Sequence, residues 1–120
     1  MSKNVLIVDD EKIIRTVLER ILKKSGFNTE IASNGKDALI KLKSHNFDLI
    51  LLDILMPEMN GLQFMNELKK TNHSTKILVI SACHEQSLMK QVKQLGAHGY
   101  LKKPFDNIDQ VTSAVNEVLG

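Results

Sequence analysis

Short aliphatic runs alternate with longer amphipathic segments along this chain. Runs such as Val5 to Val8 are apolar at successive positions, which is typical of strands buried on both faces of a sheet. The candidate strands cover residues 5–8, 27–32, 48–53, 76–80 and 98–101. The second is the weakest of these, because Asn28 and Glu30 interrupt its apolar pattern.

Each candidate strand is followed by a segment whose apolar residues repeat at the spacing of one helical face. In the first such segment these residues are Ile13, Ile14, Val17, Leu18, Ile21 and Leu22. Asn60, with Gln63 three residues later, resembles a capping box and predicts a helix that runs to about Lys70. Asp106 or Asn107 is the expected cap of the last helix.

This alternation predicts an α/β fold. Apolar strands that are each followed by a helix favour parallel pairing, with helices on both faces of the sheet. Five such units are too few to close an eightfold barrel, so an open, doubly wound five-stranded sheet remains. A chain of 120 residues fits one domain, which we expect to span residues 1–120.

Composition narrows the class of protein. Apolar residues make up 42% and charged residues 25%, which indicates a globular rather than a disordered chain. The 16 basic and 14 acidic residues give a net charge of +2, too little to argue for direct nucleic-acid binding. No apolar stretch approaches the 18 or so residues of a membrane helix, and the lone Cys83 cannot form an internal disulfide. We therefore expect a cytoplasmic protein without membrane insertion.

Polar side chains follow four of the predicted strands at the points where the strands end. Asp9 and Asp10 follow the first strand, Asp53 closes the third, Ser81 closes the fourth, and Lys103 follows the fifth. The carboxyl ends of parallel strands share one edge of the sheet, where ligands bind in open α/β folds. The sequence therefore predicts that these five side chains converge.

Their charges indicate a chemistry. Asp9, Asp10 and Asp53 together contribute about −3, which is unfavourable at close range. A divalent cation and Lys103 would roughly balance this charge, and hard oxygen ligands suit Mg²⁺. A metal and a lysine beside one carboxylate also suit phosphoryl transfer, in which the carboxylate attacks phosphorus.

Each of these residues also has an ordinary structural interpretation. Asp10 could cap the first helix and Ser81 the fourth, while Asp9 could be a loop residue and Lys103 a surface charge. The joint placement at four strand ends favours the functional interpretation. The histidines share no metal-binding spacing, and we expect all of them at the surface. They are His45, His73, His84 and His98.

Four motifs carry a family resemblance. They are Val8-Asp9-Asp10-Glu11, the run from Leu51 to Gly61, Ser81-Ala82, and the run from Gly96 to Phe105. Together they resemble the receiver domain of two-component response regulators, in the CheY-like superfamily, and the similarity extends from Val5 to about Val118. The resemblance implies the strand order 2-1-3-4-5 of the flavodoxin-like, three-layer sandwich.

The resemblance also implies a phosphorelay function with Asp53 as phosphoacceptor. The donor would be a phosphohistidine on a sensor histidine kinase or a phosphotransfer protein. Asp10 and Asp53 would coordinate Mg²⁺ with the backbone carbonyl of Leu55, and Asp9 would act mainly through water. Such a domain is no enzyme in the usual sense, because it catalyses only its own phosphorylation and dephosphorylation.

Switching is implied by the same resemblance. Ser81 and Lys103 would contact the phosphoryl group, and Ser81 and Tyr100 would shift together. This would alter the face made by the fourth helix, fifth strand and fifth helix for a downstream protein. The Lys103–Pro104 bond would be cis, and the chain would be a monomer or a phosphorylation-dependent dimer.

Three other interpretations remain. A phosphatase of the haloacid dehalogenase type would need a second Asp two residues after Asp53, where Leu55 stands. A flavodoxin-like nucleotide-binding module would need a glycine- or hydroxyl-rich loop after the first strand. A pseudo-receiver that only docks partners would not need the intact acidic and basic set. Met1 and Gly120 frame the domain closely, which favours a stand-alone regulator.

Overall fold

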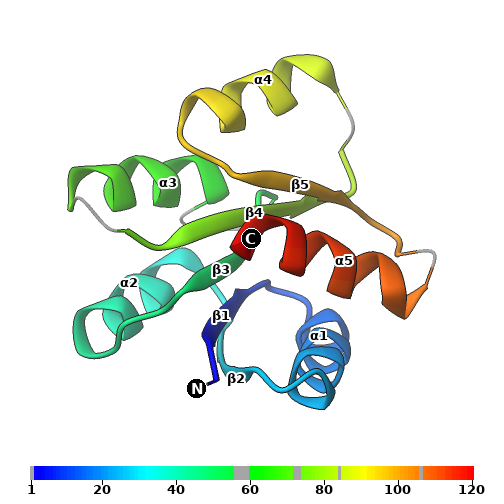
Figure 1. Cartoon of the computed structure of the whole chain (residues 1–120). Helices are drawn as coiled ribbons and strands as arrows, with labels where there is room; N and C mark the ends of the chain where they lie inside the picture. The colour runs from blue at the N-terminus through cyan, green and yellow to red at the C-terminus, as the bar shows by residue number, and fades with distance from the viewer. Residues whose placement is uncertain (1, 56–59, 72–73, 84, 106) are drawn as a thin grey trace.

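The computed structural model describes residues 2–55, 60–71, 74–83, 85–105 and 107–120. Its strands form one parallel sheet in the order β2-β1-β3-β4-β5, which confirms the predicted fold class (Figure 1). The strands are β1 (Asn4–Val8), β2 (Asn28–Ala32), β3 (Leu49–Asp53), β4 (Lys76–Ser81) and β5 (Gly99–Lys102). The helices are α1 (Lys12–Lys24), α2 (Gly35–Ser44), α3 (Gly61–Lys70), α4 (Gln86–Gln94) and α5 (Ile108–Leu119).

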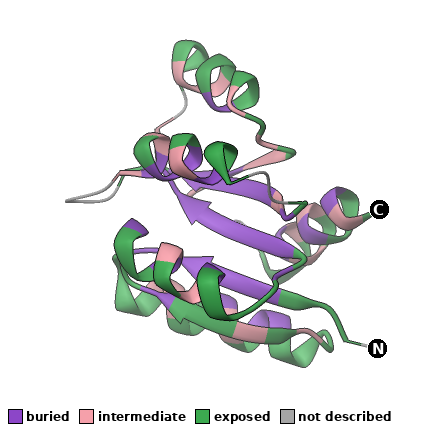
Figure 2. Ribbon diagram, turned by 90° about the vertical axis from the view of Figure 1, so that its left-hand side faces the viewer, coloured by how far each residue is buried: buried purple, intermediate pink, exposed green. Residues whose placement is uncertain are grey.

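Two apolar layers cover the two faces of the sheet. Successive side chains of a strand point to opposite faces, so Val5 and Ile7 pack with α1 and α5, while Leu6 and Val8 pack with α2, α3 and α4. Buried residues concentrate on the strands, and the outer faces of the helices are exposed (Figure 2). Burial on both faces explains why β1, β3 and β4 are apolar at successive positions.

Each strand begins or ends one residue away from its predicted limits, and the two edge strands show local causes. β2 begins at Asn28 rather than Phe27, because the Phe27 N–H donates to the Leu22 carbonyl and so completes the end of α1. β5 begins one residue after His98, whose imidazole Nδ1 accepts from the Ile77 N–H at 3.1 Å. His98 is exposed, as predicted, but its imidazole also provides a hydrogen-bond acceptor for the backbone N–H of Ile77 in β4.

Two predicted helix starts are confirmed. Asn60 and Gln63 form a complete capping box at α3, and the Asn107 side chain caps α5, whereas Asp106 lies outside the described residues. The N-cap of α1 is Glu11, whose side chain makes no capping bond. Asp10 therefore does not occupy the capping position, and its carboxylate is available for another role.

Fewer residues of α1 are buried than its apolar pattern predicts. Leu18, Ile21 and Leu22 are buried against the sheet, but Ile13 is 77% exposed and Val17 is 40% exposed.

No helix of the described residues is both long and apolar enough to span a bilayer.

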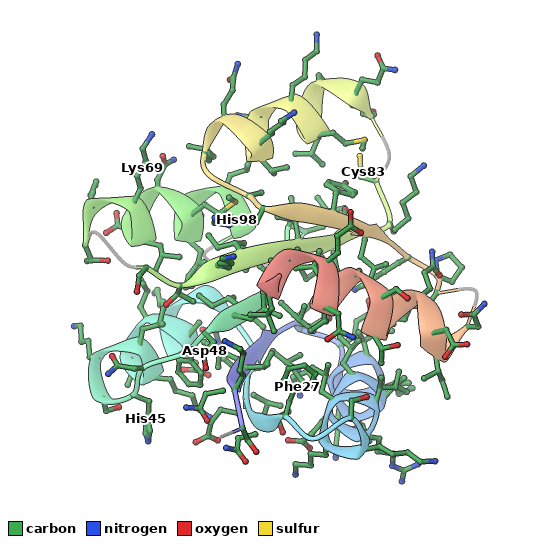
Figure 3. The ribbon with its side chains drawn as sticks, in the orientation of Figure 1. Phe27, His45, Asp48, Lys69, Cys83 and His98 are labelled. Atoms are coloured by element: carbon green, nitrogen blue, oxygen red, sulfur yellow. The ribbon has the colours of Figure 1, made fainter. Side chains whose placement is uncertain are left out.

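Lysines gather at the carboxyl ends of the helices. They lie in the last turns of α1, α2, α3 and α4, where a cation favourably meets the negative end of the helix dipole. In a parallel α/β fold this end of the helices lies opposite the carboxyl ends of the strands. Lys69 in Figure 3 belongs to this group.

Gly61 allows the first turn of α3 to pass very close to β3. A Cβ at this position would lie 2.6 Å from the Ile54 Cα and 3.0 Å from the Asp53 carbonyl oxygen. A Cβ at Gly99 would instead meet methyl groups of Val118 and Leu78, at 2.8 and 3.0 Å. Side-chain methyl groups can move aside, whereas strand backbone cannot.

We therefore expect Gly61→Ala to destabilise the protein by about 3 kcal/mol and Gly99→Ala by about 1 kcal/mol. Urea unfolding of the two variants beside wild type measures both losses. Equal losses would show that the backbone contact at Gly61 has no special cost.

Candidate functional site

Four carboxylates meet at the carboxyl edge of the sheet. β1 and β3 are neighbours, with Val8 opposite Leu52, so the residues that follow, Asp9 and Asp53, end side by side. Asp9 is fully buried and Asp53 is 3% exposed. Carboxylate oxygens of Asp9, Asp53 and the exposed Asp10 and Glu11 all lie within 4.8 Å of one another.

Lys103 brings a positive charge into this cluster from the end of β5. Its Nζ lies 2.7 Å from Asp9 Oδ2, 3.3 Å from Asp53 Oδ2 and 3.3 Å from Glu11 Oε1. The Lys103 N–H donates to the Ser81 carbonyl at 2.9 Å, which extends the β4–β5 pairing to this residue. The peptide bond from Lys103 to Pro104 is cis.

Backbone hydrogen bonds hold the two buried carboxylates. Asp9 Oδ1 accepts from the Glu11 N–H at 2.9 Å, and Asp53 Oδ1 accepts from the Leu55 N–H at 3.1 Å. In each case the strand has just ended, so the N–H two residues later is free to turn back to the side chain. One oxygen of each carboxylate is thus fixed by backbone, and the other faces Lys103.

The buried charges change the proton affinities of Asp53 and Lys103. Burial, followed by the charge of Asp9, raises the pKa of Asp53 from 3.8 to about 6, against the opposing effects of Lys103 and the Leu55 N–H. Burial lowers the pKa of Lys103, but its hydrogen bond to Asp9 and the charges of Asp53 and Asp9 outweigh this and raise it overall. Lys103 therefore stays cationic, and Asp53 takes up a proton more easily than an ordinary aspartate does.

Ser81, Cys83 and Tyr100 form a second group beside the carboxylates. The fully buried Ser81 Oγ accepts from the Cys83 N–H at 3.0 Å, and the Tyr100 hydroxyl donates to the Cys83 carbonyl. Burial is the main cause of the raised pKa of Tyr100. Cys83 lies in the segment between β4 and α4 (Figure 3), so this segment is tied to both β4 and β5.

The donor set fits a hard divalent cation. Among the described residues, the four carboxylates and the Lys103 ammonium together carry a charge of −3, and such an excess of negative charge is unfavourable at close range. Oxygen ligands of this kind, with two of the four residues open to solvent, suit Mg²⁺, which keeps several of its waters.

Comparison with known families decides the class of protein. The family model for the response regulator receiver domain matches residues 5–116. The chain belongs to this family. The receiver domain is 38% identical over 121 residues to chemotaxis protein CheY of Bacillus subtilis, with all of both chains covered.

Two further comparisons agree. The receiver domain is 34% identical to sporulation initiation phosphotransferase F of Bacillus subtilis, covering 99% of this chain and 95% of that protein. Its fold matches the solved structure of chemotaxis protein CheY4 of Vibrio cholerae with a TM-score of 0.93 and 31% identity, over 98% and 99% of the two chains. Receiver domains act in two-component signalling, and the predicted family is confirmed.

Most of the residues predicted for the site do meet in the receiver domain. Asp9, Asp10, Asp53 and Lys103 lie together, while Ser81 lies at the end of the neighbouring strand with its hydroxyl bonded to the Cys83 N–H. Other predictions concern residues outside the described ranges: the motif residues Met56 to Met59, His73 and His84.

Sequence reasoning overlooked two residues. Glu11 was noted only as part of a motif, but its carboxylate reaches Lys103. Arg15 lies outside every motif, yet its guanidinium Nη1 donates to the Asp9 carbonyl at 2.6 Å. Its only signal in the sequence is its place in the first turn of α1, shortly after the end of β1.

Proposed function

We propose that this receiver domain accepts a phosphoryl group on Asp53 from a phosphohistidine of a sensor histidine kinase or a phosphotransfer protein. The observation that carries the proposal is the contact of the Lys103 ammonium with a buried Asp53 inside a cluster of four carboxylates. Receiver domains are signalling modules, and the change of charge at Asp53 is the signal that this one would transmit.

The residues divide the chemistry between them. An oxygen of ionised Asp53 attacks phosphorus, the phosphorus–nitrogen bond of the donor breaks, and the departing imidazole takes up a proton. The Lys103 ammonium, already 3.3 Å from Asp53 Oδ2, pairs with one phosphoryl oxygen, and the Ser81 hydroxyl can donate a hydrogen bond to another. Mg²⁺ held by Asp10, Asp53 and the Leu55 carbonyl, with Asp9 acting through water, would supply charge neutralisation at these oxygens.

Switching would reach the partner surface through Ser81 and Tyr100. If the Ser81 hydroxyl turns to the phosphoryl group, it leaves the Cys83 N–H, and the segment that also binds Tyr100 loses an anchor. Tyr100 lines a hollow of about 290 Å³ between α4 and β5, with Met89 and Val92 on its apolar side. The face of α4, β5 and α5 is therefore the proposed docking surface for a downstream protein, or for a second copy on phosphorylation.

The test is intact-mass spectrometry after incubation with acetyl phosphate, with Mg²⁺ or with EDTA. Wild type should gain one phosphoryl group only with Mg²⁺, and Asp53→Asn should gain none. Asp48→Asn is the matched control, because Asp48 lies before β3, at the other end from Asp53 (Figure 3). Phosphorylation of Asp53→Asn would contradict the assignment.

The alternative is a pseudo-receiver, which binds partners but accepts no phosphoryl group. Binding of beryllofluoride distinguishes the two possibilities. This phosphoryl mimic should bind wild type even where a phosphorylated form decays too fast to detect. No adduct and no beryllofluoride binding would favour a docking module. A haloacid dehalogenase activity has no support, because the exposed Leu55 stands where the second Asp is needed.

The phosphorylated form should be long-lived. Leu55, 56% exposed, and the partly buried Cys83 flank the site, and neither side chain can orient an attacking water. Combining Leu55→Asn with Cys83→Glu should shorten the lifetime of phosphorylated Asp53 several-fold, followed by loss of the phosphorylated mass over time. An unchanged lifetime would count against this explanation.

A further inference from the structure

Arg15 holds the peptide group that joins Asp9 to Asp10, the two aspartates that follow β1. Its Nη1 donates to the Asp9 carbonyl oxygen at 2.6 Å, from a partly buried position on α1. The carbonyl of Asp9 belongs to the peptide group that joins Asp9 to Asp10. Fixing this oxygen therefore fixes the plane of that peptide.

The rest of Asp9 is already immobilised. Its N–H donates to the Ala32 carbonyl at 3.2 Å, and its carboxylate is held by the Glu11 N–H and by Lys103. Asp10 is different, because it is exposed and lies between the end of β1 and the start of α1. The direction of its side chain depends on the peptide plane that Arg15 holds.

The charge of Arg15 and its hydrogen bond have opposite effects on the affinity of the site for a cation. A positive charge near a cation site weakens cation binding through repulsion. A hydrogen bond that orients a ligand strengthens metal binding, and losing such a bond outside the ligand set costs 10- to 100-fold in affinity. The sign of the change on removing Arg15 therefore distinguishes the two roles.

We propose that Arg15 is a positioning residue for the divalent-cation site. It holds the Asp9–Asp10 peptide so that the Asp10 carboxylate stays directed into the cluster with Asp53. This inference rests on the proposed Mg²⁺-dependent function, and it adds a residue that contacts neither the cation nor the phosphoryl group.

The test measures Mg²⁺ affinity from the rise in unfolding temperature as Mg²⁺ is added to the metal-free protein. Arg15→Met keeps the aliphatic stem and should raise the Mg²⁺ concentration at half effect about 10-fold. Arg20→Met is the matched control, since Arg20 is an exposed arginine of the same helix and its loss removes the same charge. Arg20→Met should stay within about 2-fold of wild type.

Two further measurements distinguish positioning from a general structural role. At saturating Mg²⁺ the rate of phosphorylation of Arg15→Met by acetyl phosphate should approach that of wild type, because the ligands are all present. Arg15→Lys keeps the charge but not the planar donor, and should raise the half-effect concentration less than Arg15→Met does. It also carries the test if Arg15→Met does not fold.

Three results would overturn the inference. Tighter Mg²⁺ binding by Arg15→Met would mean that only the charge of Arg15 matters. An unchanged half-effect concentration with a lower unfolding temperature in EDTA would mean that Arg15 only stabilises the fold. If Mg²⁺ leaves the unfolding temperature of wild type itself unchanged, the proposed metal site fails, and the inference fails with it.

Discussion

Replacing Lys103 with methionine should destabilise the metal-free protein by about 3 kcal/mol, because the change leaves buried carboxylates without their cation. The Lys103 side chain is 10% exposed and contacts Asp9, Asp53 and Glu11. Asp9 cannot turn to solvent, since it is fully buried and held by the Glu11 N–H. Removing one member of such a group costs much more than removing a surface charge.

Urea unfolding at neutral pH in EDTA measures this loss. Lys102→Met is the control, because Lys102 is exposed at the end of β5 and its loss removes the same charge. Lys102→Met should change the free energy of unfolding by about 0.5 kcal/mol or less. Adding Mg²⁺ should restore part of the stability of Lys103→Met, since a divalent cation can neutralise the same carboxylates. A Lys103→Met protein as stable as Lys102→Met would contradict the assigned ion pairs.

Asp53→Asn should be more stable than wild type above about pH 6 in the absence of metal, and the advantage should shrink as the pH falls toward 4. The pKa of Asp53 is raised to about 6 in the folded protein, from 3.8. Between these two values the folded state keeps a proton that the unfolded chain has released. The free energy of unfolding of wild type therefore falls as the pH rises through this window, by about 3 kcal/mol in total.

The measurement is urea unfolding of wild type and Asp53→Asn in EDTA across this pH range. Asp109→Asn serves as control, because Asp109 is exposed in the first turn of α5 and should give no such gain. Mg²⁺ should then stabilise wild type but not Asp53→Asn. A difference that is the same at every pH would show that burial of Asp53 imposes no charge penalty.

The site could be predicted because strand ends converge by topology alone. Once β1, β3 and β5 are known to be parallel, Asp9, Asp53 and Lys103 must share one edge of the sheet, wherever they lie in the chain. The structure places Lys103 Nζ within 3.3 Å of both carboxylates. The start of α3 was predictable for a different reason, because Asn60 and Gln63 cap this helix through hydrogen bonds between residues only three apart in the chain.

Contacts from a side chain to a distant backbone group were not predictable. The bond from Arg15 to the Asp9 carbonyl depends on how α1 is tilted against β1. The bond from His98 to the Ile77 N–H depends on the register of β4 and β5. In sequence both residues look like exposed polar positions, and Ile13 likewise could not be distinguished from the buried Leu18 by periodicity alone.

The lysines in the last turns of the helices and the carboxylate cluster separate charges of opposite sign along the molecule. Its net charge is only +2, but the carboxylate cluster lies at one end and the lysines of α1 to α4 at the other. A partner with a positively charged surface attracts the end that carries Asp53 and repels the end that carries the lysines. The domain is therefore oriented with Asp53 toward the partner as the two proteins approach. Its encounter rate with such a partner should fall with ionic strength, whereas the net charge of +2 alone would make the rate rise.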